Sequence, residues 1–333
     1  MSKVLHNDTE VYISRENDPQ FNLALEEVLF NEIRSDQRRF LFYVNRPSVI
    51  IGKHQNPWTE CSLDKMAENG IGFFRRFSGG GTVYHDLGNL NLSFMGPVSH
   101  NATDSNLKLA LKHIRSIGVE AYQKDKSDLF MGNQKFSGSA FAIKKDKILH
   151  HMTFLVSTDL AHLKNWLKPM IEVAKSNGLV SRRAEVMNLS EVKPDLNVAG
   201  MREGLISLLK KEFPILTVRE VGVGDISPSA VDVEQKKMKS WDWRYGNTPD
   251  FKIRHRLNNK SDSPEFYISI HRGKIKTIRV DNIDHIRVKQ LQNELQGLRF
   301  NPLTLSSKIE DILNNLPKAS VSPDWEAQAK LFN

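Results

Sequence analysis

The stretch between Val119 and Val156 constrains the fold of this chain most, because short apolar runs alternate there with tight polar connections. Two of these connections, Gly132-Asn133 and Lys144-Lys145-Asp146-Lys147, have the composition of turns. Strands joined by so few residues must pair antiparallel, since a parallel pair needs a much longer crossover. We therefore predict an α+β fold with mixed, mostly antiparallel sheets flanked by helices, and we exclude a doubly wound parallel sheet.

Amphipathic helices are predicted on both sides of this meander. One follows Asp18-Pro19, where the aspartate can cap the helix and the proline suits its first turn. Further helices are predicted at 62–66, 106–117, 160–166 and 198–213. The runs 40–44 and 49–51 predict a hairpin, because a turn at Arg46-Pro47 separates them. Leu90, Leu92 and Phe94 alternate with polar residues and predict a half-buried strand.

A domain boundary is predicted where aromatic residues give way to Gly, Asn and Pro, in the segment WDWRYGNTP that ends at Pro249. A chain of 333 residues also exceeds the usual length of one domain. Beyond the boundary, the runs 266–270 and 275–280 flank Arg272-Gly273 and predict a second hairpin, which two amphipathic helices follow. We expect a large domain at 1–245 and a small one at 250–333.

Composition is that of an ordinary globular protein, with 39% hydrophobic and 26% charged residues and a mean hydropathy of -0.43. No apolar run approaches the ~20 residues that a transmembrane helix needs. The single cysteine, Cys61, cannot form an intramolecular disulfide, which favours a reducing compartment. The N-terminal segment is acidic and has no apolar signal core, so we expect a cytoplasmic protein, or a mitochondrial one that lacks its presequence.

The formal net charge of +8 favours an acidic partner, although an ordinary basic surface is the simpler alternative. A nucleic-acid-binding module is a further class that would be basic. The chain has neither a concentrated basic helix nor an aromatic RNA-binding motif, which argues against that class.

The strongest functional signal is a triple glycine after two arginines, in the segment RRFSGGGTVYHDLGNLN that begins at Arg75. Glycines let a backbone approach a ligand closely, and arginines neutralise an anionic ligand such as phosphate, although a tight structural turn is the alternative. The segment differs from a Walker loop, because no GKS or GKT closes it. It also differs from a dinucleotide fingerprint, because Thr82-Val83-Tyr84 favours a strand over a helix.

The glycine segment follows a strand predicted at 71–74, so the expected order is strand, glycine loop, strand. Arg75 and Arg76 would lie on opposite faces of that strand. We therefore expect one of them to enter a site and the other to be solvated.

Two further segments could contribute chemistry. Lys135 lies on a predicted strand that runs into the turn Ser137-Gly138-Ser139. A lysine ammonium can stabilise a developing negative charge, although most strand lysines are simply solvated. His150-His151 opens another strand, followed by Thr153. Adjacent strand residues face opposite ways, so the histidine pair does not favour a zinc site.

Together these segments resemble the lipoate-protein ligase A family, which also includes the mitochondrial lipoyltransferases. Four blocks occur in the family's order, IIGKHQNPWTEC, RRFSGGGTVYHDLGNLNLSF, QKFSGSA and HHMTFLV. The resemblance extends from about Phe21 to Trp243, and WDWRYGNTPDF is similar to the family's junction with a small accessory domain. It implies a catalytic domain of the biotin/lipoate ligase type at 1–245 and an accessory α+β domain at 250–333.

The resemblance implies an ATP-dependent enzyme. Lipoate would be activated to lipoyl-AMP with release of pyrophosphate, and the lipoyl group would then pass to a lysine of a lipoyl domain. The expected acceptors are the E2 subunits of 2-oxoacid dehydrogenases and the glycine-cleavage H protein, whose often acidic lipoyl domains suit a basic enzyme. ATP and Mg²⁺ are the expected cofactors, and the chain would act as a monomer with no nucleic-acid or membrane partner.

The resemblance also implies roles for single residues. Lys135 would be catalytic, between the lipoyl carbonyl and the phosphate, and would contact lipoate together with Arg76 and Gly80. Asp128 would position Lys135 or a magnesium ion. The residues expected to bind ATP or lipoyl-AMP are Arg76, Ser78, Gly79, Gly80, Gly81, Thr82, Val83, Tyr84, Lys135, Ser137, Gly138, Ser139, His151 and Thr153. An apolar slot for the dithiolane is expected, on composition, near Val44, Phe77 and Phe141.

Two positions depart from the family's common pattern. Thr82 stands where many ligases have alanine, and transferases also have threonine there. The alternative function is therefore a lipoyltransferase that uses preformed lipoyl-AMP or a lipoylated donor protein without efficient ATP activation. Met152 replaces a commonly small residue after the paired histidines, which leaves the shape of that pocket open.

Overall fold

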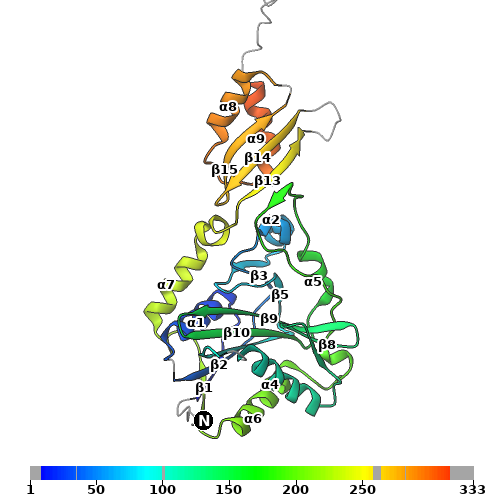
Figure 1. Ribbon diagram of the computed structural model, residues 1–333, viewed down its shortest axis with the longest axis vertical. Coiled ribbons are helices and arrows are strands. Elements are labelled where there is room, and N and C mark those ends of the chain that lie inside the picture. Colours follow the sequence, from blue (N-terminus) through cyan, green and yellow to red (C-terminus); the bar gives the residue numbers. More distant parts are fainter. Residues whose placement is uncertain (1–8, 35, 100–101, 258–263, 282, 316–333) are drawn as a thin grey trace, which may run out of the picture. The chain divides into compact units, whose positions relative to one another are not determined.

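The structure, a computed structural model, describes residues 9–34, 36–99, 102–257, 264–281 and 283–315 (Figure 1). The chain forms two compact units. The first unit comprises residues 1–172 and 176–250, and the second comprises 173–175 and 251–333. The second unit therefore includes the short segment Val173–Lys175, which the sequence pattern did not assign to it.

The first unit is built on a mixed sheet that has eight strands within the described residues, in the order β12-β1-β2-β6-β10-β9-β8-β7. β1 pairs in parallel with β12 and β2, whereas every pairing from β2 to β7 is antiparallel. The meander β7 to β10 therefore forms as predicted, and the predicted α+β class is confirmed. The strands are β1 (Thr9–Ser14), β2 (Arg38–Tyr43), β6 (Asn89–Pro97), β7 (Tyr122–Lys124), β8 (Asp128–Met131), β9 (Gln134–Lys144), β10 (Lys147–Leu155) and β12 (Leu216–Val221).

Helices cover both faces of the large sheet (Figure 1). α4 and α6 pack on one face, in a core that contains Phe42 and Phe154. α1 and α7 pack on the other face, in a core that contains Leu41 and Leu149. α1 begins as predicted, because the Asp18 side chain accepts hydrogen bonds from the backbone N–H groups of the first turn. The helical segments are α1 (Pro19–Glu32), α2 (Pro57–Glu60), α3 (Leu63–Glu68), α4 (Ala102–Ser116), α5 (Leu160–Trp166), η1 (Leu189–Glu191), α6 (Val198–Glu212), α7 (Pro228–Lys239) and η2 (Asp242–Gly246).

A small sheet of order β4-β3-β5 completes the first unit in the part of the chain that the structure describes. β3 (Ser48–Ile51) pairs in parallel with β4 (Gly72–Arg75) and antiparallel with β5 (Val83–His85). The predicted hairpin of 40–44 with 49–51 is wrong, because β2 belongs to the large sheet and β3 to the small one. The predicted order of strand, glycine loop and strand is confirmed, since the triple glycine joins β4 to β5.

The prediction of a half-buried strand around Leu92 is also wrong. β6 lies inside the large sheet between β2 and β10, and its residues from Asn89 to Gly96 are buried on both faces. Its polar side chains find partners in the interior instead of solvent. Asn91 donates to the carbonyl of Tyr43 at 3.2 Å, and Ser93 donates to a carboxylate on α1.

The second unit has a sheet of order β11-β13-β14-β15 in its described residues. The predicted hairpin is confirmed as β14–β15, and Arg272 and Gly273 at its turn have φ values of 50° and 69°. The two predicted helices follow as α8 and α9. The elements are β11 (Lys175–Ser176, of which Lys175 belongs to this unit), β13 (Phe251–Arg256), β14 (Glu265–His271), β15 (Lys274–Val280), α8 (His285–Leu295) and α9 (Pro302–Asn314).

Candidate active site

A cavity of about 1220 Å³ in the first unit is lined by residues of both its sheets. The glycine loop Gly79–Thr82 and the start of β5 contribute from the small sheet, and β9 and β10 contribute from the large one. Small-molecule sites typically enclose about 300–1,000 Å³. The cavity therefore has the size needed for a nucleotide together with a second ligand.

Arg76 is buried behind the glycine loop and shapes it from within. Its Nη2 donates to the carbonyls of Gly79 and Gly81, each at 2.6 Å, and its Nη1 donates to the carbonyl of Ile50 at 3.1 Å. Burial lowers the pKa of Arg76 to about 10, with Tyr43 and Glu26 opposing the shift, so the side chain stays charged at neutral pH. Arg76 therefore places a fixed positive charge in the cavity wall.

Arg75 does not enter the cavity, and it is not solvated either. Its side chain is fully buried and donates to the carbonyls of Gly52, Lys53 and Gln55 at 2.8–3.1 Å. It also donates to the carbonyl of Arg244. The expectation of a solvated second arginine is therefore wrong, because backbone carbonyls satisfy this guanidinium in the interior.

Lys135 reaches the cavity from the start of β9. Its Nζ lies 3.0 Å from Asp128 Oδ1 on β8, and the two side chains are 23% and 19% exposed. Ser127 Oγ donates to the same carboxylate oxygen at 3.0 Å. On the other side, a Cβ added at Gly138 would lie 2.8 Å from the lysine Nζ. The Lys135 ammonium group therefore lies between the Asp128 carboxylate and the backbone of Gly138 at the cavity wall.

Buried side chains form a hydrogen-bonded chain from α1 to the glycine loop. Glu26 is fully buried, accepts from Ser93 Oγ at 2.5 Å and lies 3.1 Å from His151 Nδ1. His151 Nε2 lies 2.9 Å from Ser78 Oγ, which accepts from Arg76 Nε at 3.1 Å. Because a carboxylate only accepts, the proton of a neutral His151 is on Nδ1, and Ser78 donates to Nε2.

Burial and neighbouring groups together determine the protonation states of these hydrogen-bonded residues. Desolvation alone would raise the pKa of Glu26. His151 lowers it through its hydrogen bond and, when protonated, through its charge, and the Ser93 hydroxyl and the charge of Arg76 lower it further. Burial, reinforced by the positive charge of Arg76 and by that of His151 when it is protonated, lowers the pKa of His85 to about 3, so that ring is neutral. This hydrogen-bonded series therefore consists of an ionised Glu26, an oriented imidazole of His151 and a charged Arg76.

The sequence matches the family described as the lipoyl protein ligase A/B catalytic domain over residues 18–210. The chain belongs to this family. A lipoate-protein ligase A of Bdellovibrio bacteriovorus is 31% identical over 305 residues, which cover 87% of this chain and 88% of the relative. A lipoate-protein ligase A of Psychrobacter cryohalolentis is 28% identical over 92% of this chain and 93% of its own length.

Solved structures of the family have the same fold. The P. falciparum protein LipL1, solved in complex with lipoate, has a TM-score of 0.63 and 26% identity, with 97% of this chain and 98% of that chain covered. A lipoate-protein ligase A bound with ATP has a TM-score of 0.59 and 28% identity, covering 71% of this chain and 98% of that one. A bipartite ligase of Thermoplasma acidophilum, studied with its E2 lipoyl domain, has a TM-score of 0.61 and 28% identity. The match covers 71% of this chain and 95% of that one.

Most of the residues that the family resemblance singled out meet in the cavity. Those that line it are Arg76, Gly79, Gly80, Gly81, Thr82, Val83, Asp128, Lys135, Gly138, Ser139, His151 and Thr153. Ser78, Tyr84 and Ser137 are buried behind the wall instead. Phe77 and Phe141 line the cavity, but Val44 packs against the core of the large sheet and forms no part of the apolar wall.

The family resemblance did not single out several residues of the site. Leu23, Tyr43 and Ile50 form an apolar end of the cavity beside Phe77, whose ring stacks on Phe30 at 5.7 Å between centroids. Asn91 also lines the cavity, and Glu26 is buried behind His151. Leu23 and Glu26 lie on α1, where their spacing appears only as part of an amphipathic pattern, so no local signal distinguishes them.

A second missed element is the segment Leu179–Arg182, which lines the cavity beside the glycine loop. Ser181 Oγ accepts from the backbone N–H of Thr82 and from Gln55 Nε2, both at 2.9 Å, and donates to Glu60. The segment is therefore tied to the glycine loop by a serine hydroxyl. In sequence it was visible only as a basic polar connection containing Ser181-Arg182-Arg183.

The described residues were also compared with the requirements of a metal site and of a membrane-spanning helix. Among the described residues, no group of three or more His, Cys, Asp and Glu side chains is arranged to hold a metal ion. His150 and His151 face opposite sides of β10 as expected, since His150 packs on Phe94 while His151 lines the cavity. None of the described helices combines the length and the apolar character that crossing a bilayer would require.

Proposed function

We propose that this chain is an ATP-dependent lipoate-protein ligase. The main observation in its favour is that a single cavity holds a glycine loop with a cation behind it, an ammonium group from Lys135 and an apolar end beside Phe77. These features suit a nucleotide phosphate, a reacting carbonyl and an acyl chain. Relatives solved with lipoate and with ATP support the same assignment.

The first reaction that we propose is activation of lipoate. A carboxylate oxygen of lipoate attacks the α-phosphorus of ATP, and the bond from that phosphorus to the bridging oxygen breaks. The products are lipoyl-AMP and pyrophosphate. Lys135 stabilises the negative charge on the oxygens around the α-phosphorus, while Arg76 and the glycine loop hold the phosphate region in place.

The second reaction is transfer to the acceptor. The uncharged amine of the acceptor lysine attacks the lipoyl carbonyl carbon, the bond from that carbon to the phosphate oxygen breaks, and AMP leaves with the electron pair. The attacking nitrogen loses one proton to solvent as the amide forms. Lys135 again neutralises charge, first at the carbonyl oxygen and then on the departing phosphate, so one cation serves both steps.

Magnesium fits this scheme as a companion of ATP. Mg²⁺ in nucleotide sites is usually held by one or two carboxylates together with substrate phosphates. Asp128 lines the cavity and would supply such a carboxylate. When bound, Mg²⁺ neutralises phosphate charge and thereby favours departure of pyrophosphate.

The acceptors that we propose are lipoyl domains of 2-oxoacid dehydrogenase E2 subunits and the glycine-cleavage H protein. The T. acidophilum ligase was studied with its own E2 lipoyl domain, which supports this partner class. A lysine side chain is long and flexible, so it can enter a cavity that the folded acceptor cannot.

Lipoate-dependent release of pyrophosphate from ATP tests the proposal. We expect the purified chain to release pyrophosphate in a burst without an acceptor, and continuously when an E2 lipoyl domain is added. Transfer from synthetic lipoyl-AMP without any release of pyrophosphate from ATP would identify the chain as a lipoyltransferase instead.

Replacing Gly138 by alanine is expected to slow lipoylation without unfolding the protein. The new Cβ would lie 2.8 Å from Lys135 Nζ and 2.9 Å from its Cε, so the flexible lysine must move away. Displacing a catalytic group by about 1 Å can cost on the order of 100-fold in rate. Turnover and thermal melting would be measured on the same preparation.

The matched control is Gly200→Ala in α6, where the new Cβ would meet its nearest atom at 3.5 Å. This variant should keep wild-type turnover. Wild-type turnover in the Gly138 variant would show that the position of Lys135 is not critical.

A further inference from the structure

The sheet of the second unit has two chemically opposite faces. Ile253, Ile268 and Ile278 point to one face and are buried there, and on that side α8 packs against β15. His255 Nε2 on β13 also lies 2.9 Å from Ser306 Oγ on α9, which ties that helix to the sheet. Residues of the other parity are exposed or half-buried, so the second face is open to solvent.

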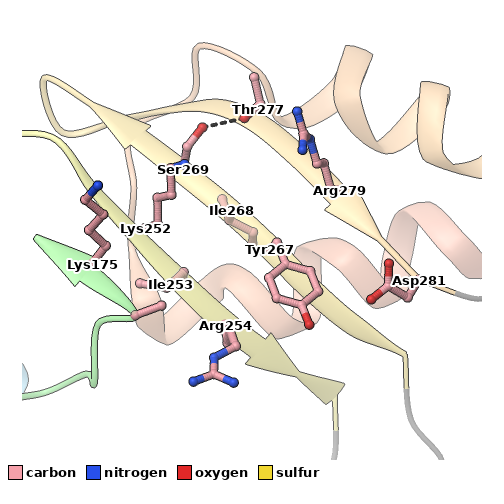
Figure 2. Close-up of a pocket in the computed structure, with 11 residues that line it drawn as sticks. Lys175, Lys252, Ile253, Arg254, Tyr267, Ile268, Ser269, Thr277, Arg279 and Asp281 are labelled. Atoms are coloured by element: carbon pink, nitrogen blue, oxygen red, sulfur yellow. Dashed lines mark hydrogen bonds between the residues drawn. The ribbon is translucent and has the colours of Figure 1, made fainter.

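This open face is hollowed and basic. A shallow pocket of about 600 Å³ lies over it, and Figure 2 shows its residues on neighbouring strands. We call the following residues the basic face: Lys175, Lys252, Arg254, Tyr267, Ser269, Thr277 and Arg279. One carboxylate, that of Asp281, also lines the pocket at the end of β15 (Figure 2).

Among the described residues, the cations of the basic face form no direct ion pair, although the Asp281 carboxylate lines the same pocket. Within the residues that the structure describes, no carboxylate lies within ion-pair distance of Lys175, Lys252, Arg254 or Arg279. The nearby Glu265 is already engaged, since Arg256 lies 3.1 Å away and the hydroxyl of Tyr267 donates to it. Four positive charges and the single negative charge of Asp281 therefore leave a net charge of +3 (4 − 1) around this pocket. Such an excess is unusual because opposite charges normally intersperse on a surface.

The register of the strands arranges these groups in rows. Arg254, Tyr267 and Arg279 are directly paired across β13, β14 and β15, and Lys252 is paired with Ser269 in the adjacent row. Tyr267 is 39% exposed between the two arginines. Arginine and tyrosine, together with tryptophan, are enriched among energetically dominant interface positions. The basic face thus combines residue types that are common at protein interfaces with a net positive charge.

We infer that the basic face docks the acidic surface of the acceptor lipoyl domain. This inference rests on the proposed function, because that function supplies the acceptor. The face offers charge complementarity and donors in fixed rows, and an acidic partner would be attracted before its lysine enters the cavity. Nucleic acid fits less well, since sheets that bind RNA stack two or three bases on aromatic rings. Among the described residues lining this pocket, Tyr267 is the only aromatic.

A double charge reversal, Arg254→Glu with Arg279→Glu, tests the docking surface in the full chain. Both side chains are exposed, so the fold should tolerate the change. We expect kcat/KM for an E2 lipoyl domain to fall about 10-fold or more at low salt, because electrostatic steering changes association rates by about 10- to 1,000-fold. Lipoate-dependent pyrophosphate release without acceptor should stay at the wild-type level.

The control is Lys289→Glu with Lys308→Glu on α8 and α9, which changes net charge equally at exposed positions outside the basic face. This control should keep near wild-type acceptor kinetics. In about 1 M salt, where charges are screened beyond ~3 Å, the difference between the two double variants should shrink. An equal loss in both double variants, or no loss in either, would overturn the docking surface.

Direct binding of the lipoyl domain, followed by fluorescence anisotropy, separates this inference from the proposed function. If the wild-type chain released no pyrophosphate, the proposed function would fail, and weaker binding by the Arg254/Arg279 variant would still support docking. Tighter binding of single-stranded RNA than of the lipoyl domain, lost in that variant, would reject the acidic-protein partner.

Discussion

Replacing Lys135 by alanine is expected to reduce both half-reactions by about 100- to 1,000-fold, which is the cost of removing one donor from a preorganised anionic site. Lys135 is the cation that the cavity presents from β9, and Asp128 holds its Nζ at 3.0 Å. Pyrophosphate release from lipoate and ATP would measure the first step. Transfer from synthetic lipoyl-AMP to an E2 lipoyl domain would measure the second.

The comparison variants make this result specific. Lys144→Ala removes a cation from the same strand, where the ammonium donates to Asn31 Oδ1 on the exposed surface, and it should leave turnover unchanged. Lys135→Arg keeps the charge but replaces a compact ammonium by a planar fork, and we expect it to recover little activity. Full lipoylation by the alanine variant would refute the role assigned to Lys135.

The class of fold was predictable from the sequence because it depends on local connection lengths. Tight turns between Val119 and Val156 force antiparallel pairing wherever those strands lie. The partner of each strand was less predictable. β2 and β3 are separated by a short turn, yet they lie in different sheets. Alternation identifies a strand and its faces, but it does not identify the strand beside it.

The predicted part of the site consists of residues with unusual local sequence. Three consecutive glycines after two arginines are conspicuous, and the family resemblance directed attention to Lys135 and His151. The buried polar residues were not recognisable. Glu26 meets Ser93 and His151 at separations of 67 and 125 residues, and only the folded sheet brings them together. A carboxylate on an amphipathic helix is ordinarily a surface residue, so its burial has no signature in the sequence.

The buried carboxylate of Glu26 leads to a testable prediction. Glu26→Gln should lower turnover by about 10- to 100-fold, because hydrogen bonds to charged groups contribute about 1.5–3 kcal/mol and each 1.4 kcal/mol is about tenfold in rate. Glutamine cannot supply the charge that orients His151 and, through Ser78, Arg76. We expect kcat to fall in both half-reactions while the KM for the acceptor stays constant, since the chain of bonds does not reach the acceptor surface.

If Glu26 had only a structural role, its replacement would lower the melting temperature and turnover would fall only as far as the protein unfolds. The neighbouring residue Glu27 provides the control. Glu27 on α1 is half-buried, with its side chain 12% exposed, and its Oε1 accepts from Lys237 on α7 at 2.6 Å, away from the cavity. Glu27→Gln should match the Glu26 variant in any loss of melting temperature and keep wild-type turnover. Nitrogen-15 NMR of the His151 ring should show the Nδ1–H tautomer in the wild type and in Glu27→Gln, and a mixed population in Glu26→Gln. Unchanged turnover with an unchanged tautomer in Glu26→Gln would mean that the glycine loop and Arg76 hold their positions without this carboxylate.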